Sequence, residues 1–148
     1  MTTFNDASFL RLARFIANEW SKDPSSKIGA VIVRPDNTTA SMGVNGPPRG
    51  LPNDEEILYN REKKYQFILH AEENAINFKK EPLDGYTIYI YPYHPCTKCS
   101  SLIIQNGIRR VVIPNESTPD RWQSNFSEAE SMLLTVGVDV CKIDLNGG

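Results

Sequence analysis

The 148-residue chain contains 40% hydrophobic and 23% charged residues, an ordinary composition for a single globular domain spanning residues 1–148. Its net charge of −2 and pI of about 5.7 argue against a large nucleic-acid-binding surface. No apolar run approaches the roughly 20 residues of a membrane span. Residues 1–6 lack the basic start and apolar segment of a secretory signal. We therefore expect a cytoplasmic protein that binds neither membranes nor nucleic acids.

The first half of the chain predicts a helix and a hairpin before a long connection. Apolar residues at helical spacing predict a helix over 5–21, which the following Asp23-Pro24 ends. β-branched runs at 28–33 and 38–44 flank a turn at 35–37 and predict a β-hairpin. Residues 45–69 are long and mixed, with a helix expected only at 61–65, and connections of this length in small domains are usually functional.

The second half alternates helices and strands. A helix over 71–79 precedes predicted strands at 86–91, 110–114 and 138–143, which are separated by helices at 97–106 and 127–135. Such alternation implies right-handed crossovers and parallel pairing. Together with the hairpin, it predicts an α/β fold: a three-layer α/β/α domain with a mixed central sheet of about five strands.

Histidine and cysteine are rare in this chain, and most of them gather in two motifs. His70 lies 25 residues before Pro95, which opens the Pro95-Cys96-Thr97-Lys98-Cys99 motif. One imidazole and two thiolates can hold zinc and leave its fourth position to water, as in catalytic zinc sites. His94 is an alternative fourth ligand, and a closed site with four protein ligands would indicate a zinc-stabilised binding module. Cys141 follows alternating valines and is expected to be a strand cysteine without a chemical role.

Glu72 supplies a carboxylate two residues after His70. Residues two apart in a regular helix point to different sides. Both side chains can therefore reach one water only if His70 lies at the end where the helix begins and Glu72 lies in its first turn. Cys96 and Cys99, at the start of the next helix, share a face, and the helix dipole stabilises their thiolates. The carboxylate can then carry a proton from water to a ring nitrogen or a leaving amine. H-x-E followed by P-C-x-x-C is the signature of zinc-dependent nucleobase deaminases.

Residues 8–113 resemble a known family more broadly. The zinc motifs resemble the cytidine deaminase-like superfamily, and further segments resemble its deoxycytidylate (dCMP) deaminase branch. These segments are SKDPSSKIGA at 21–30, GVNGPPRG at 43–50, the approach to His70 at 64–70, and the helix at 102–108. The resemblance implies a cytidine deaminase-like fold and hydrolysis of dCMP to dUMP and ammonia, which supplies dUMP for thymidylate synthesis.

The resemblance also implies roles for individual residues. His70, Cys96 and Cys99 would bind zinc, and Glu72 would move protons. Asn45 would hold the sugar, and the backbones of Ala71 and Cys96 would contact the pyrimidine and the attacking water. Candidates for the 5′-phosphate are Ser25, Ser26 and Lys27, and Arg121, which lies beyond the resembling residues, is a further candidate that would close over the phosphate. For the serines the alternative is a plain turn into the first strand, and for Arg121 a solvated side chain beside a packed Trp122.

Many members of this branch are homohexamers that dCTP activates and dTTP inhibits, each bound with magnesium. The corresponding segment here contains Gly46, Arg49, Asn53, Asp54 and Glu55. Arg49 would contact the effector phosphates, and Asp54 and Glu55 would hold Mg²⁺, unless they form an ordinary acidic loop. This chain departs from the family at His94, where an apolar or aromatic residue is usual.

A second enzyme class shares the zinc motifs. A tRNA adenosine deaminase also carries H-A-E and P-C-x-x-C. The acidic pI and the 23 residues between Gly46 and His70 argue against that alternative.

Overall fold

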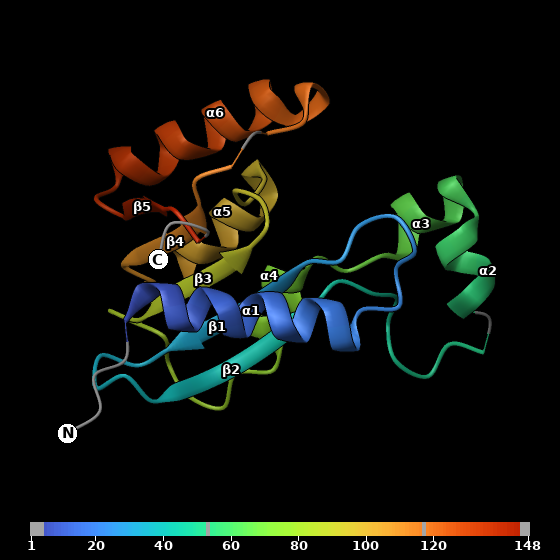
Figure 1. Cartoon of the computed structure of the whole chain (residues 1–148), viewed down its shortest axis with the longest axis horizontal. Helices are drawn as coiled ribbons and strands as arrows, with labels where there is room; N and C mark the ends of the chain where they lie inside the picture. The colour runs from blue at the N-terminus through green and yellow to red at the C-terminus, as the bar shows by residue number, and fades with distance from the viewer. Residues whose placement is uncertain (1–4, 53, 117, 146–148) are drawn as a thin grey trace.

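A mixed β-sheet forms the middle layer of the molecule (Figure 1). The computed structural model describes residues 5–52, 54–116 and 118–145. Within them the sheet has five strands in the order β2-β1-β3-β4-β5. They are β1 (Gly29–Val33), β2 (Thr39–Val44), β3 (Thr87–Tyr91), β4 (Arg110–Pro114) and β5 (Asp139–Ile143). Strand β1 pairs antiparallel with β2 and β3, whereas β3, β4 and β5 are parallel. The predicted hairpin and parallel crossovers are both confirmed.

Helices cover both faces of this sheet. Helix α1 (Asp6–Trp20) lies on one face, and α4 (Ala71–Asn77), α5 (Thr97–Gln105) and α6 (Asp120–Thr135) lie on the other (Figure 1). Successive strand residues point to opposite faces. In β1, Ala30 and Ile32 accordingly join the core under α4 and α5, while Val31 and Val33 join the core under α1. The three-layer α/β/α prediction is therefore confirmed.

Helix α4 rests directly on strand β2 at Gly43. A Cβ atom on Gly43 would lie 2.4 Å from the backbone nitrogen of Ala75 and 2.7 Å from the carbonyl oxygen of Ala71. Both of these atoms are helix backbone and cannot swing away, so only glycine permits this approach. The contact fixes the height of α4 above the sheet, and with it the position of the residues at the start of the helix.

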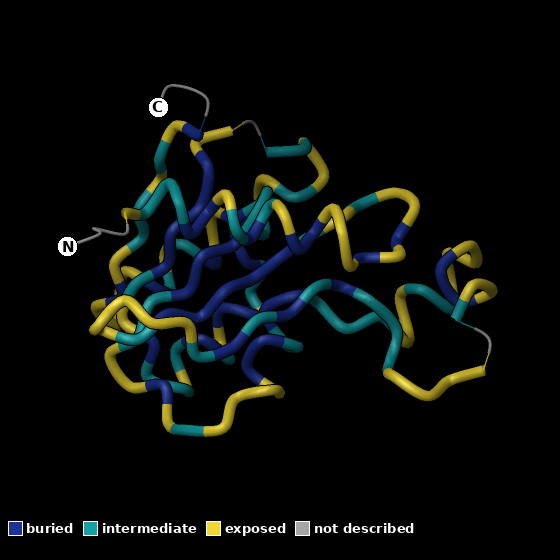
Figure 2. Tube along the Cα trace, turned by 60° about the horizontal axis from the view of Figure 1, so that its bottom comes forward, coloured by how far each residue is buried: buried dark blue, intermediate teal, exposed yellow. Residues whose placement is uncertain are grey.

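Helices α2 (Asp54–Tyr59) and α3 (Arg61–Phe67) form a hairpin that stands apart from the sheet at one end of the molecule (Figure 1). Most of its residues are exposed or half-buried, in contrast to the buried central strands (Figure 2). The sequence pattern predicts only part of α3 and leaves α2 as an acidic connection. Asp54 and Glu55 lie in the first turn of α2, where the helix dipole favours negative charge.

Helix α6 begins at Asp120, well before the predicted start at residue 127. Trp122, Phe126, Ala129 and Leu133 continue one helical stripe across the predicted boundary, and Asp120 supplies an acidic first turn. The other predicted elements agree with the structure to within two residues at each end. Among the described residues, no helix is both long and apolar enough to cross a membrane.

Candidate functional site

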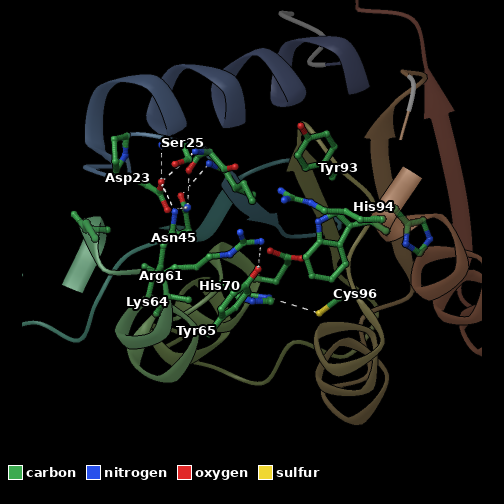
Figure 3. Close-up of a pocket in the computed structure, with 18 of the residues that line it drawn as sticks. Asp23, Ser25, Asn45, Arg61, Lys64, Tyr65, His70, Tyr93, His94 and Cys96 are labelled. Carbon is green, nitrogen blue, oxygen red and sulfur yellow. Dashed lines mark hydrogen bonds and ion pairs between the residues drawn. The ribbon is translucent and has the colours of Figure 1, made fainter. Parts of the chain in front are cut away.

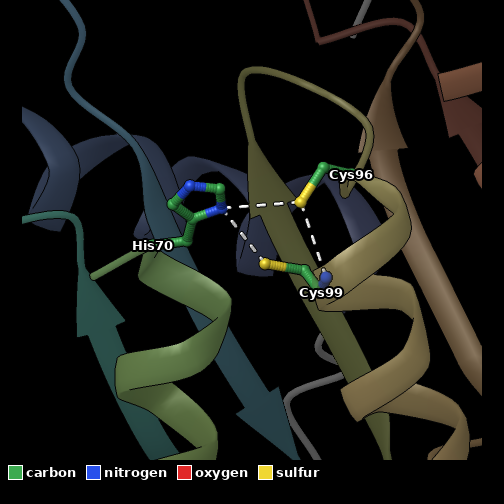
Figure 4. A group of neighbouring side chains, drawn as sticks. All are labelled: His70, Cys96 and Cys99. Carbon is green, nitrogen blue, oxygen red and sulfur yellow. Dashed lines mark hydrogen bonds between the residues drawn. The ribbon is translucent and has the colours of Figure 1, made fainter. Parts of the chain in front are cut away.

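His70, Cys96 and Cys99 converge at the starts of two neighbouring helices (Figure 4). His70 immediately precedes α4, Cys96 immediately precedes α5, and Cys99 lies in the first turn of α5. The Nδ1 atom of His70 lies 3.3 Å from the sulfur of Cys99 and 3.6 Å from the sulfur of Cys96. We call these three residues the His/Cys cluster.

The spacing of the His/Cys cluster fits a tetrahedral zinc ion. Ligands at about 2.0 Å for nitrogen and about 2.3 Å for sulfur, arranged tetrahedrally, place nitrogen and sulfur roughly 3.5 Å apart. The three donor atoms all lie within 4.8 Å of one another, and the described residues add no fourth histidine, cysteine or carboxylate to the group. His94 is not part of this group, and its Nδ1 lies 2.7 Å from the carbonyl oxygen of Pro95.

Local hydrogen bonds already favour a thiolate in this cluster. The Cys96 sulfur caps α5 by accepting the backbone N–H of Cys99 at 3.5 Å. The hydrogen bond from the Cys99 thiol, and then that from His70, lowers the pKa of Cys96 to about 4. The same contact with Cys96 raises the pKa of Cys99, and the Cys96 thiolate raises the pKa of His70 to about 9. A bound metal would displace the remaining protons from these ligands.

Glu72 lies beside the cluster, in the geometry that the sequence required. His70 is the N-cap of α4, so Glu72 falls in the first turn of that helix. The Glu73 carboxylate accepts the His70 backbone N–H at 2.9 Å and fixes this helix start. Glu72 is only 5% exposed, and burial raises the pKa of its carboxyl group to about 7. A carboxyl group with such a pKa can both accept and donate a proton near neutral pH.

A cavity of about 630 Å³ opens from the His/Cys cluster (Figure 3). Its walls come from the 23–28 loop, Asn45, the α2–α3 hairpin, the two zinc motifs and the start of α6. The lining residues are Asp23, Pro24, Ser25, Ser26, Ile28, Asn45, Leu58, Tyr59, Arg61, Lys64, Tyr65, Ile68, His70, Glu72, Tyr93, His94, Cys96, Arg121, Trp122 and Phe126. The predicted catalytic residue and two of the predicted zinc ligands therefore face one cavity with several predicted substrate residues.

Asp23 organises the loop at the end of the cavity away from Cys96 (Figure 3). Its side chain is 1% exposed and accepts the backbone N–H groups of Ser25 at 2.8 Å and Ser26 at 3.1 Å. It also pairs with the Lys64 ammonium of α3 at 2.8 Å. Sequence reasoning indicates only a helix breaker at Asp23. A polar residue directly before Pro-Ser-Ser was the available signal, since aspartate commonly bonds the backbone two residues on.

The Asn45 side chain bonds the same loop with all of its amide atoms. Its oxygen accepts from the Ser21 hydroxyl at 2.8 Å and from the Ile28 N–H at 2.9 Å. Its nitrogen donates to the Ser26 carbonyl at 2.8 Å and to the Asp23 carboxylate at 3.3 Å. Asn45 is 6% exposed and lines the cavity. The sugar-binding role stays a prediction, and a structural role for this amide was missed.

The other predicted substrate residues divide into two groups. Ser25, Ser26 and Arg121 line the cavity. Lys27 does not, and its ammonium donates to the Ser21 carbonyl instead. Ala71 is fully buried at the start of α4. The structure adds two cations that sequence reasoning missed, Arg61 and Lys64, both supplied by α3.

Among the described residues of the predicted effector segment, Gly46, Arg49, Asp54 and Glu55 do not line the cavity. Gly46 pairs with Leu69 in an isolated β-bridge, and the Arg49 guanidinium lies over the Phe78 ring at 5.7 Å. Asp54 forms an ion pair with Lys22 at 3.2 Å. Glu55 is exposed on α2, and Asn53 lies outside the described residues. The effector and magnesium roles of this segment stay predictions.

His94, the departure from the family pattern, is a packed residue. It is 7% exposed, and its ring lies 5.7 Å from that of Phe126 on α6. Desolvation lowers its pKa, so the ring is neutral near pH 7. In this chain His94 fills the space between the zinc-binding turn and α6.

Comparisons with known proteins agree with this geometry. Residues 4–114 match the sequence model described as the cytidine and deoxycytidylate deaminase zinc-binding region. The chain is 40% identical to an uncharacterized deaminase in the luxG 3′ region of Aliivibrio fischeri, over 93% of this chain and 92% of that protein. It is 35% identical to human deoxycytidylate deaminase over 72% of this chain, and so spans only 62% of that relative.

A solved structure extends the likeness over nearly the whole chain. The dCMP deaminase of cyanophage S-TIM5, in complex with dCMP and dUMP, superposes with a TM-score of 0.75 at 26% identity, covering 97% of this chain and 99% of that one. The family match includes the complete His/Cys cluster and Glu72. The chain therefore belongs to the cytidine and deoxycytidylate deaminase family.

Proposed function

We propose that this protein hydrolyses dCMP to dUMP and ammonia as a single zinc-dependent deaminase domain. The observation that carries the proposal is one cavity with two chemically different ends. The His/Cys cluster and Glu72 lie at one end, and Ser25 lies with cationic residues of α3 towards the other (Figure 3). A nucleoside monophosphate has the same polarity, with an aminated ring to be hydrolysed at one end and a dianion at the other.

The catalytic end would work through Glu72. His70, Cys96 and Cys99 would hold the zinc ion, which when bound would acidify a water molecule for attack on the aminated ring carbon. Glu72 takes a proton from that water and delivers it to the ring nitrogen. It then carries the second proton to the departing amino group, so that the carbon–nitrogen bond breaks and ammonia leaves. The raised pKa of Glu72, about 7, suits a group that must both take up and release protons.

The phosphate end would work through arginine. Asp23 already neutralises Lys64, which leaves Arg61 and Arg121 as the cavity cations available to a phosphate dianion. Arg61 is held over the Tyr65 ring at 5.7 Å, which limits its conformations before substrate arrives. Planar guanidinium groups are well suited to phosphate oxygens. Ser25 and Ser26 can add hydroxyl contacts, but their backbone N–H groups are committed to Asp23.

We also infer the regulation and assembly that the family resemblance implies. The protein would form a homohexamer. It would be activated by dCTP and inhibited by dTTP, each bound with Mg²⁺ at the 46–55 segment. It would act in the cytoplasm and supply dUMP for thymidylate synthesis. Support comes from the exposed Arg49 guanidinium, which is preorganised over Phe78 outside the cavity.

A substrate panel tests the proposal. Zinc-loaded protein is incubated with dCMP, dCTP, deoxycytidine, cytosine and an anticodon stem-loop, and released ammonia is measured. We expect turnover of dCMP well above that of the others. Turnover of a different substrate without turnover of dCMP would overturn the assignment, and activity on the stem-loop would favour the tRNA deaminase alternative. Adding dCTP and dTTP should shift the dCMP saturation curve in opposite directions, and unchanged curves would count against regulation alone.

A further inference from the structure

The start of α6 contributes one wall of the cavity although it lies outside the family match, which ends at residue 114. Arg121, Trp122 and Phe126 all line the cavity. We call these three residues the α6 wall. The position of this wall depends on the contacts that α6 makes with α5 and with the turn before it.

Asn125 ties the α6 wall to the helix that carries the two cysteines. Its side-chain oxygen accepts the Thr97 backbone N–H at 3.1 Å, and its side-chain nitrogen donates to the Thr97 hydroxyl at 3.2 Å. Thr97 is the first residue of α5 and directly follows Cys96. Its N–H is one of the donors that a helix start cannot satisfy internally. Asn125 therefore caps the cysteine-bearing helix from a different helix.

Aromatic packing holds the same turns of α6 at a second point. The Trp122 and Phe126 rings stack with centroids 5.8 Å apart and an interplanar angle of 10°. The Phe126 ring in turn packs on His94, two residues before Cys96. Asn125 follows Arg121 and Trp122 by four and three residues, so all three lie on neighbouring parts of one helix face. The hydrogen bonds of Asn125 and the packing of Phe126 on His94 thus hold the α6 wall at two points against the turn that contains Cys96.

We propose that Asn125 is a positioning residue that sets the distance between the α6 wall and the zinc-binding turn, and so fits the cavity to a nucleoside monophosphate. Asn125 does not line the cavity and acts through Arg121 and Trp122. The inference rests on the proposed deamination of dCMP. A shift of α6 would misplace the phosphate partner Arg121 while leaving the His/Cys cluster and Glu72, which lie at the starts of α4 and α5, in place.

The test separates substrate binding from the chemical step. In Asn125→Ala we expect the KM for dCMP to rise about tenfold, kcat to stay within about threefold, and the bound zinc to be unchanged. Asn125→Asp keeps an oxygen acceptor for the Thr97 N–H at a helix start that favours negative charge, and should recover most of the lost affinity. Thr97→Val removes only the hydroxyl contact and should give a smaller rise in KM. Ser124→Ala, at an exposed neighbouring position of the same helix, is the matched control.

Fluorescence of Trp122 gives a second measurement that does not need turnover. The chain contains two tryptophans, and Trp20 is 53% exposed on α1, so Trp20→Phe leaves Trp122 as the single reporter. In this background dUMP should change the emission, with about tenfold weaker binding when Asn125→Ala is added. If Asn125→Ala matches Ser124→Ala in both assays, or loses stability or zinc without a change in KM, the positioning role is overturned while dCMP deamination stands. If the Trp20→Phe protein responds to no nucleotide and does not turn over dCMP, both proposals fail.

Discussion

The two ends of the cavity are built in different ways. At the zinc end, the His/Cys cluster and Glu72 lie at the starts of α4 and α5, and the α4 backbone packs directly on strand β2 at Gly43. At the other end, α3 has no buried residue and is linked to the 21–28 loop by the Lys64–Asp23 ion pair. Backbone packing fixes atoms tightly, whereas single side-chain ties leave local opening free energies low. The residues that carry out the reaction would thus be held rigidly, whereas the residues that recognise the substrate would be free to adjust their positions.

Among the variants considered, Glu72→Gln should lower kcat the most. The variant keeps the shape of the buried side chain but cannot carry protons, so we expect kcat to fall by on the order of 10³–10⁴. Zinc content, measured by metal analysis, should be unchanged, because Glu72 is not in the His/Cys cluster. Appreciable activity in zinc-replete Glu72→Gln would refute the proton-transfer role.

Gly43→Ala tests whether backbone packing fixes the zinc end. The added methyl group would meet the α4 backbone at 2.4 and 2.7 Å, so the helix must shift. We expect a loss of about 1–3 kcal/mol in the free energy of unfolding, measured with urea, together with a fall in kcat. Gly46→Ala is the stability control, since a Cβ atom there would meet nothing within 4 Å beyond its chain neighbours. Equal stability of the two variants would show that α4 is not held by this approach.

The zinc end was also the part that sequence predicted best. His70, Glu72, Cys96 and Cys99 are close in sequence to helix starts, so their convergence follows from local rules once the strands between them are paired. The requirement that Glu72 lie in the first turn came from helix geometry alone and is confirmed. Periodic apolar residues likewise predicted the strands, because burial on two faces leaves a clear pattern.

The recognition end could not be predicted, for an equally physical reason. Lys64 and Asp23 are separated by 41 residues in the sequence, and Asn125 and Thr97 by 28. No local sequence pattern therefore predicts either contact. Helix α2 has only six residues, too few for periodicity to distinguish it from a charged loop. Lys27 is a phosphate candidate, together with Ser25 and Ser26, through the family resemblance. In the folded chain its ammonium bonds the Ser21 carbonyl, and α3 supplies the nearby cations.

Lys64→Met tests the ion pair between Lys64 and Asp23 at the substrate-recognition end of the cavity. The substitution keeps an aliphatic stem but removes the cation from Asp23, whose side chain is 1% exposed. Asp23 retains its backbone donors, so we expect a cost of about 1–3 kcal/mol in stability and a several-fold rise in the KM for dCMP. The neighbouring Lys63 pairs with Glu56 at an exposed position, and Lys63→Met should cost less than about 1 kcal/mol. Similar stability and KM for the two variants would remove the special role of Lys64.

Asp6→Asn provides a reference remote from both ends. Asp6, at the start of α1, accepts hydrogen bonds from Tyr89 at 2.7 Å and Arg110 at 2.8 Å, and the Arg110 bonds lower the pKa of its carboxyl group. A lowered folded-state pKa stabilises the protein above the unfolded-state value of about 4, and that contribution is lost as the pH falls through the folded-state pKa. The partly exposed pair should be worth about 1 kcal/mol at pH 7.

Urea unfolding of the wild type and Asp6→Asn at pH 7 and pH 3 measures this contribution. The wild type should be the more stable at pH 7, and the difference should shrink between pH 7 and pH 3, because the unfolded-state carboxyl group of Asp6 takes up a proton below its pKa of about 4. A difference that persists at pH 3 would assign the effect to the shape of the side chain and not to its charge. Asp6 lies on the α1 side of the sheet, opposite α4 and α5, so kcat and KM at pH 7 should both stay at wild-type values. A variant that loses stability without losing activity would show that the changes expected for Gly43→Ala and Lys64→Met arise from the cavity ends they hold, and not from lower stability alone.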